Sequence, residues 1–193
     1  MVPMPSNKCS LSEDQQNYLL KLARDSIRHG LQHGRPLRVE MANLPQELKA
    51  VRATFVTLEK LGELRGCIGR LEAARPLAED IAENAYSAAF QDPRFPPLRE
   101  NELDLLEIHL SLLTPAEPMT FTSEQNLLDQ MQAGLDGLIL AEGSRRGTFL
   151  PSVWEQLPEP VEFLNHLKLK AGLPSSYWSD TLKVWRYRTE VVE

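Results

Sequence analysis

Cysteine, long apolar runs and basic charge are all scarce in this chain of 193 residues, and each shortage excludes a class of protein. Two cysteines cannot form the disulfide framework of a small secreted domain. No apolar run is long enough to cross a bilayer, so we expect no membrane segment. The net charge of -6 argues against a surface devoted to nucleic acid. Because the first residues lack a charged-then-apolar signal pattern, we expect a cytoplasmic protein with a flexible lead-in over residues 1–9.

Motifs for metals and cofactors are also missing. His29 and His33 have the spacing of two ligands on one helix face, but flanking glycines put them at a fraying end and no third ligand follows. The turn Gly143–Gly147 carries Arg145 and Arg146 but matches no phosphate-binding loop, and an exposed hairpin turn is the expected structure. We therefore expect no metal site and no cofactor.

The composition, 42% hydrophobic and 25% charged, is that of an ordinary globular domain. Apolar periodicity, turn residues and a capping-box spacing of Ser10 and Glu13 predict alternating helices and strands. We expect helices over 11–33, 76–91, 123–132, 153–157 and 161–171, and strands over 55–58, 64–68, 105–113, 138–140, 148–150 and 182–188. Hairpins with irregularly interspersed helices indicate an α+β fold with mainly antiparallel sheets flanked by helices.

The most informative segment is Leu64–Gly69, which reads Leu-Arg-Gly-Cys-Ile-Gly and returns from a predicted hairpin turn at Leu61-Gly62. Glycine weakens a strand and usually marks a bulge or a close approach of another group. In regular extended backbone, Arg65 and Cys67 point to the same face. The chain therefore gives up strand stability to place a guanidinium and a thiol together. We predict a ligand-binding surface here that includes Gly66 and Gly69.

Eight short blocks along the chain resemble, in order and with natural spacing, those of the AMMECR-one domain family. They are Phe55–Leu58, Leu64–Gly69, Ala88–Phe90 with Asp92–Phe95, Glu102-Leu103, Ser111–Pro115, Gly137–Leu140, Phe149–Pro151 with Val153-Trp154, and Lys170–Leu173. The resemblance covers nearly the whole chain. It implies a single domain over residues 1–193, built as two intimately packed α+β lobes with a discontinuous boundary.

The resemblance also implies partners but no established activity. The family is similar to protein A of the AmmeMemoRadiSam system, which is associated with a Memo-like protein and a radical S-adenosylmethionine protein. We therefore expect a component that works with such proteins and binds an anionic small molecule or a partner at the Leu64–Gly69 surface.

A thiol-dependent enzyme is one alternative. Arg65 would stabilise a Cys67 thiolate, and His109 is the best candidate for a general base because it shares a strand face with Glu107. A carboxylate beside a histidine fixes its tautomer, as in catalytic triads. The structural alternative is that Cys67 is a small packed hydrophobe and that His109 and Glu107 are routine polar residues of a half-exposed strand.

Arg94 supports the binding hypothesis. It lies in Asp92-Pro93-Arg94-Phe95, where proline can hold the guanidinium rigidly, and arginine binds carboxylate or phosphate through two parallel hydrogen bonds. With Arg65, it would form an anion pocket beside Cys67. The structural alternative is that Arg94 pairs with Asp92 or caps the preceding helix.

A second alternative is an RNA- or nucleotide-binding regulator. Basic and aromatic residues alternate near the C-terminus, a combination that grips single-stranded nucleic acid by charge and stacking. These residues are Lys168, Lys170, Tyr177, Trp178, Lys183, Trp185, Arg186, Tyr187 and Arg188. Tryptophan and tyrosine at such positions more often belong to a core, so nucleic acid is the less favoured partner.

Overall fold

The computed structural model describes residues 9–193, which divide into two compact units. One unit comprises residues 9–113 and 190–193, and the other comprises residues 114–189. Apart from Cys9, the lead-in expected over residues 1–9 lies outside the described residues. No helix in the described chain combines the length and apolar character needed to cross a membrane.

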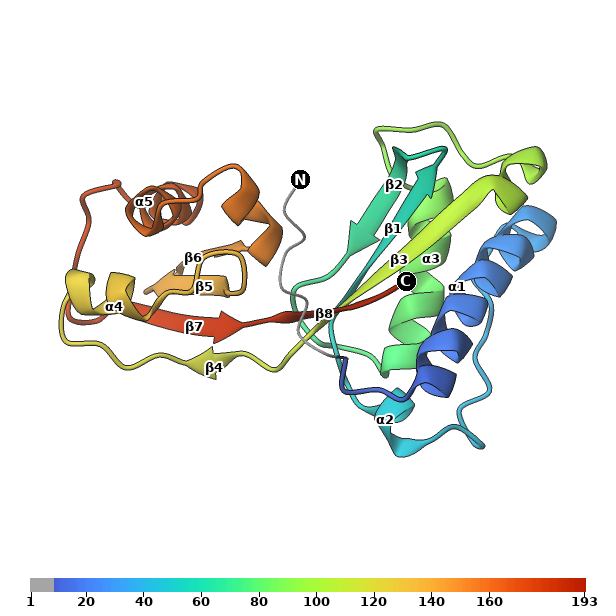
Figure 1. Ribbon diagram of the computed structural model, residues 1–193, viewed down its shortest axis with the longest axis horizontal. Helices are drawn as coiled ribbons and strands as arrows, with labels where there is room; N and C mark the ends of the chain where they lie inside the picture. The colour runs from blue at the N-terminus through green and yellow to red at the C-terminus, as the bar shows by residue number, and fades with distance from the viewer. Residues whose placement is uncertain (1–8) are drawn as a thin grey trace. The chain divides into compact units, whose positions relative to one another are not determined.

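The first unit is a four-stranded sheet with two long helices on one face (Figure 1). The strands run in the order β2-β1-β3-β8, and the β1–β2 and β1–β3 pairs are antiparallel. Its elements are α1 (Glu13–His33), α2 (Gln46–Lys49), β1 (Thr54–Lys60), β2 (Glu63–Gly69), α3 (Leu77–Phe90), a 3-10 helix (Glu100–Leu105), β3 (Leu106–Leu113) and β8 (Thr189–Val192).

Local sequence explains where α1 begins and ends. Ser12 is the N-cap, and it forms a capping box with Gln15 in place of the predicted pair Ser10 and Glu13. Ser10 instead donates its hydroxyl proton to Glu190 at 2.9 Å. Gly34, at φ 68°, ends the helix in the left-handed conformation, which agrees with the predicted helix end at residue 33.

Alternation along the strands separates the core face of this sheet from its other face. Val56 and Leu58 of β1 are buried in the cluster that α1 and α3 cover, whereas Thr57 and Glu59 are half-buried on the opposite face. The alanine-rich side of α3 lets that helix lie close to the sheet: a Cβ at Gly66 would come within 2.2 Å of the Ala88 carbonyl oxygen. Gly66 is therefore required for helix–sheet packing.

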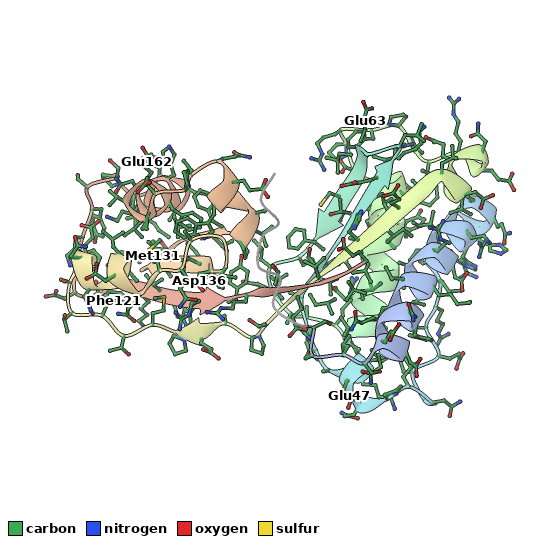
Figure 2. All side chains as sticks on the ribbon, in the orientation of Figure 1. Glu47, Glu63, Phe121, Met131, Asp136 and Glu162 are labelled. Carbon is green, nitrogen blue, oxygen red and sulfur yellow. The ribbon has the colours of Figure 1, made fainter. Side chains whose placement is uncertain are left out.

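The second unit is another four-stranded sheet, in the order β4-β7-β5-β6, whose described pairs are all antiparallel. Its elements are β4 (Glu117–Pro118), α4 (Glu124–Gln130), β5 (Gly137–Glu142), β6 (Arg145–Phe149), a 3-10 helix (Pro151–Glu155), α5 (Pro160–Lys170) and β7 (Lys183–Tyr187). Trp154 stacks on Phe163 with ring centroids 3.9 Å apart, and Figure 2 shows the labelled Phe121 and Met131 in the same unit. Trp154 and Phe163 are both buried, so this stacked pair belongs to the hydrophobic core of the second unit.

The predicted α+β class with antiparallel sheets is confirmed. Two strands were not predicted: β4 has only two residues, and β8 follows β7 after a single residue. The expected closing strand over 182–188 is therefore β7 alone, and the next four residues join the other sheet. Strands this short carry too few alternating residues to give a periodic signal.

Candidate functional site

A β-bulge interrupts strand β2 at Arg65. In the ladder with β1, Leu64 lies opposite Glu59 and Gly66 lies opposite Leu58, which leaves Arg65 as the extra residue. The prediction that Arg65 and Cys67 share one strand face assumed regular alternation, which the bulge interrupts between these two residues. Gly66, next to the bulge, has no positive φ, so the close approach of the Ala88 carbonyl group explains this glycine.

The bulge directs Arg65 to Glu102 of the 3-10 helix. Arg65 Nε and Nη2 each lie 3.1 Å from a Glu102 carboxylate oxygen, and Nη2 also donates to the Pro96 carbonyl oxygen at 2.9 Å. Lys60 donates to the same carboxylate at 2.7 Å. These hydrogen bonds, that from Arg65 above all, hold the pKa of Glu102 well below its usual range. Arg65 is 8% exposed, so this cation is largely withdrawn from solvent.

Asp92 and Arg94 bind the free edge of β2 at Cys67. Asp92 Oδ2 accepts the Cys67 backbone N–H at 2.9 Å, and Arg94 Nη2 donates to the Cys67 carbonyl oxygen at 3.3 Å. Asp92 and Arg94 are also paired, which confirms the structural alternative for Arg94. The hydrogen bond from the Arg94 side chain is the main reason that the pKa of Asp92 lies below its usual range. The hydrogen bond from the Cys67 N–H lowers this pKa further. Two side chains therefore take the place of a neighbouring strand.

Gly69 has a packing role comparable with that of Gly66. A Cβ at Gly69 would lie 2.3 Å from the Thr54 carbonyl oxygen and 2.4 Å from the Phe55 ring. The two predicted site glycines thus permit close approach by the protein's own groups.

Cys67 and His109 occupy one row across the sheet, with Thr57 between them. The register pairs Thr57 with Cys67 on one side and with His109 on the other. The Thr57 hydroxyl donates to Cys67 Sγ at 3.3 Å. Among the described residues, no hydrogen bond joins the thiol to the imidazole. The row brings the two predicted catalytic residues onto one face but places a threonine where a general base would have to contact the sulfur.

His109 has carboxylate neighbours from β1, from its own strand and from the C-terminal residue. Its Nδ1 lies 3.2 Å from a Glu193 oxygen, and its Nε2 lies 3.7 Å from a Glu59 oxygen. Glu107 lies opposite Glu59 in the ladder and offers a carboxylate oxygen to the same group. The carboxylate hydrogen-bonded to His109 is therefore that of Glu193, and Glu107 contributes to the acidic surroundings.

The pattern of the AMMECR1 family matches residues 20–192. The chain belongs to the AMMECR1 family. A relative from Methanothermobacter thermautotrophicus is 39% identical over 183 residues, which cover 94% of this chain and 95% of the relative. One from Thermotoga maritima is 43% identical over 151 residues, or 77% of this chain and 82% of the relative. The crystal structure of the uncharacterized protein PH0010 from Pyrococcus horikoshii superposes with a TM-score of 0.78 at 33% identity, over 94% and 92% of the two chains.

In this AMMECR1 domain, three of the five basic residues near the C-terminus have acidic partners. Lys168 is fully buried and bonds Glu124, and Arg186 and Arg188 both approach the buried Asp136 that is labelled in Figure 2. Tyr187 is 3% exposed, and burial raises its pKa to about 12. The surface therefore offers less free cationic charge than the sequence pattern indicates.

Three residues of the candidate site were not among the predicted ones. Glu102, Thr57 and Glu193 contact Arg65, Cys67 and His109 respectively. The residues joined by these three contacts are 37, 10 and 84 positions apart in the chain, respectively. Even the Thr57 contact does not follow from the predicted turn alone. Regular pairing around Leu61-Gly62 would put Thr57 opposite Gly66, and the bulge shifts the register by one residue so that Thr57 lies opposite Cys67.

Proposed function

We propose that this AMMECR1 domain binds a small anionic molecule at a surface formed by Cys67, Asp92, Arg94 and Phe95, which we call the Arg94 surface. The observation that supports the proposal most directly is the state of Arg94. Its Nε and Nη2 are held by Asp92 at 3.0 and 2.7 Å, yet the side chain remains 54% exposed. A guanidinium that is fixed before the ligand arrives loses little conformational freedom on binding.

The charge around this surface favours an anion. Lys60 and Arg65 share the carboxylate of Glu102, so among the described residues one of these two positive charges lacks a counter-ion of its own. The guanidinium carbons of Arg65 and Arg94 lie 6.0 and 5.4 Å from the centre of the Phe95 ring. Arg65 Nη1 is buried and has no hydrogen-bond acceptor among the described residues. An acceptor-rich ligand such as a phosphate or carboxylate suits an excess of fixed donors.

Cys67 is a half-buried member of this surface, and within residues 9–193 no catalytic base contacts its sulfur. Binding explains the arrangement without a chemical step, so we place the thiol in the ligand's surroundings. The family resemblance supports a role beside Memo-like and radical S-adenosylmethionine proteins, with the protein acting in the cytoplasm. In that setting the domain would hold an anionic molecule or group on which such enzymes act.

Calorimetric titration of the full chain with inorganic phosphate and with succinate tests the proposal. We expect saturable binding of at least one of these two probes. Arg94→Gln should weaken it about tenfold or more, because a charge-assisted hydrogen bond contributes about 1.5–3 kcal/mol. Cys67→Ser should leave the affinity within about a factor of two, since binding does not use the thiolate.

Arg28→Gln provides the matched control. Arg28 is also a surface arginine, 46% exposed, and it pairs with Asp25 three residues away at 2.6 Å. The control should bind the probe as the unmodified chain does. Absence of saturable binding, or equal weakening by the two arginine substitutions, would overturn the proposal.

A further inference from the structure

Three adjacent strands bring one imidazole and three carboxylates together on the face of the sheet opposite α1 and α3. Glu59 lies on β1, Glu107 and His109 lie on β3, and Glu193 follows β8. The ladder pairs Glu59 with Glu107 and Thr57 with His109, so these strand residues share one face. We propose that Glu59, Glu107 and His109 bind one first-row divalent cation, with Glu193 as a positioning residue for the imidazole.

The spacing of the ligand atoms fits a single ion after small side-chain movements. One nitrogen or oxygen from each of Glu59, Glu107 and His109 lies within 4.8 Å of the others. Two atoms bound at about 2.1 Å to a common ion are at most about 4.2 Å apart. The His109 Nε2 to Glu59 distance of 3.7 Å already lies within that limit, although it is too long for a hydrogen bond.

The state of the imidazole is a separate indication of a missing ligand. His109 Nε2 is buried and has no hydrogen-bond partner among residues 9–193. Its other ring nitrogen, Nδ1, faces the Glu193 carboxylate at 3.2 Å. If Nδ1 carries the proton that Glu193 accepts, Nε2 presents a lone pair toward Glu59. Metal-binding histidines in proteins are commonly held in this way by a carboxylate on the far nitrogen.

The negative charge of the three carboxylates around His109 also favours the binding of a cation. Within the described chain, Glu59 and Glu193 form ion pairs only with His109, and Glu107 forms none. Three carboxylates thus surround one imidazole with no lysine or arginine between them. Oxygen and imidazole ligands together suit Mn²⁺, Fe²⁺ or Zn²⁺. Glu59 comes from another strand than Glu107 and His109, which explains why the complete ligand set is not visible as a spacing in the sequence.

Titration of the untagged full chain with Zn²⁺ and with Mn²⁺, followed by calorimetry, tests the site. We expect one equivalent of at least one ion to bind, with a shift of the His109 ring nitrogen signals in NMR spectra. Glu59→Gln and His109→Gln should each weaken binding about 10-fold or more, and Glu193→Gln about 10- to 100-fold. Circular dichroism checks that each variant is folded.

His29→Gln is the control. His29 and His33 lie next to each other, with ring centroids 4.3 Å apart, and they are the obvious place for non-specific metal binding. Affinity that is unchanged in His29→Gln but lost in Glu59→Gln and His109→Gln supports the proposal. No saturable binding, or binding that Glu59→Gln and His109→Gln leave unchanged, overturns it.

Discussion

Asp92 and Arg94 are joined by two parallel hydrogen bonds, Nε to Oδ1 at 3.0 Å and Nη2 to Oδ2 at 2.7 Å, while each also binds the backbone of Cys67. The pair closes the edge of β2, where exposed backbone groups would otherwise accept another strand. It also fixes the half-exposed guanidinium on which the proposed anion binding depends. One side-chain pair therefore serves both the fold and the proposed site.

Replacing Asp92 should reveal its structural role. Asp92→Asn removes a buried charge that accepts from Arg94 and from the Cys67 N–H, and we expect a loss of about 1–3 kcal/mol in the free energy of unfolding. Urea denaturation measures it. Asp25→Asn breaks a more exposed arginine pair and should cost less than about 1 kcal/mol. Equal losses in the two variants would show that Asp92 contributes no more than a surface pair.

Two buried aspartates should give pH dependences of opposite sign. The pKa of Asp92 is lowered in the folded chain, so its stabilisation is complete above its ordinary value of 3.8 and is lost as the pH falls through the folded value. Burial raises the pKa of Asp80, so its contribution is complete below 3.8 and is lost as the pH rises through the folded value.

The measurement is the stability of Asp92→Asn and Asp80→Asn relative to the unmodified chain between pH 2.5 and about 7. The disadvantage of Asp92→Asn should shrink toward acid pH. Asp80→Asn should improve relative to the unmodified chain as the pH rises. Curves that run in parallel for the two variants would contradict both assignments.

Glu102 should be the most costly acidic residue to neutralise in the first unit. Glu102→Gln leaves Arg65 buried without a counter-ion and also removes the partner of Lys60, and we expect a loss of about 3 kcal/mol or more. Glu83→Gln, which breaks a 3.7 Å contact with Arg75 at a 41% exposed side chain, should cost less than about 1 kcal/mol. Chemical unfolding of both variants measures the two losses in the free energy of unfolding. Losses of similar size would show that Glu102 contributes no more to stability than an exposed ion pair.

A methyl group at Gly66 should disturb the packing of α3 on the sheet. Gly66→Ala places a Cβ 2.2 Å from the Ala88 carbonyl oxygen, and we expect a cost of about 2 kcal/mol or more. Gly34→Ala meets open space and strains only the φ of 68°, with an expected cost of about 1 kcal/mol. Thermal unfolding of the Gly66→Ala and Gly34→Ala variants compares their stabilities. A Gly66→Ala variant as stable as Gly34→Ala would mean that the helix moves away freely.

Sequence periodicity predicted the elements with a strong local signal. The β3 strand over 106–113, with alternating leucine and isoleucine, and the Leu61-Gly62 hairpin turn are examples. Sequence periodicity did not reveal the extra residue at Arg65, because a bulge interrupts the alternation and shifts the pairing of all residues beyond it. The predicted pairing of Arg94 with Asp92 needed only a two-residue span, whereas the Glu102 and Glu193 contacts depend on tertiary folding.

The most direct test of the central claim is an NMR titration of the full chain with inorganic phosphate, following the side-chain Nε–H of Arg94 and the backbone N–H of Cys67. We expect the chemical shifts of both signals to change together and to saturate with one affinity, while the chemical shift of the Arg28 Nε–H stays constant. Signals of Arg94 and Cys67 that stay in place while phosphate binds elsewhere, or that change only in proportion to ionic strength, would contradict it.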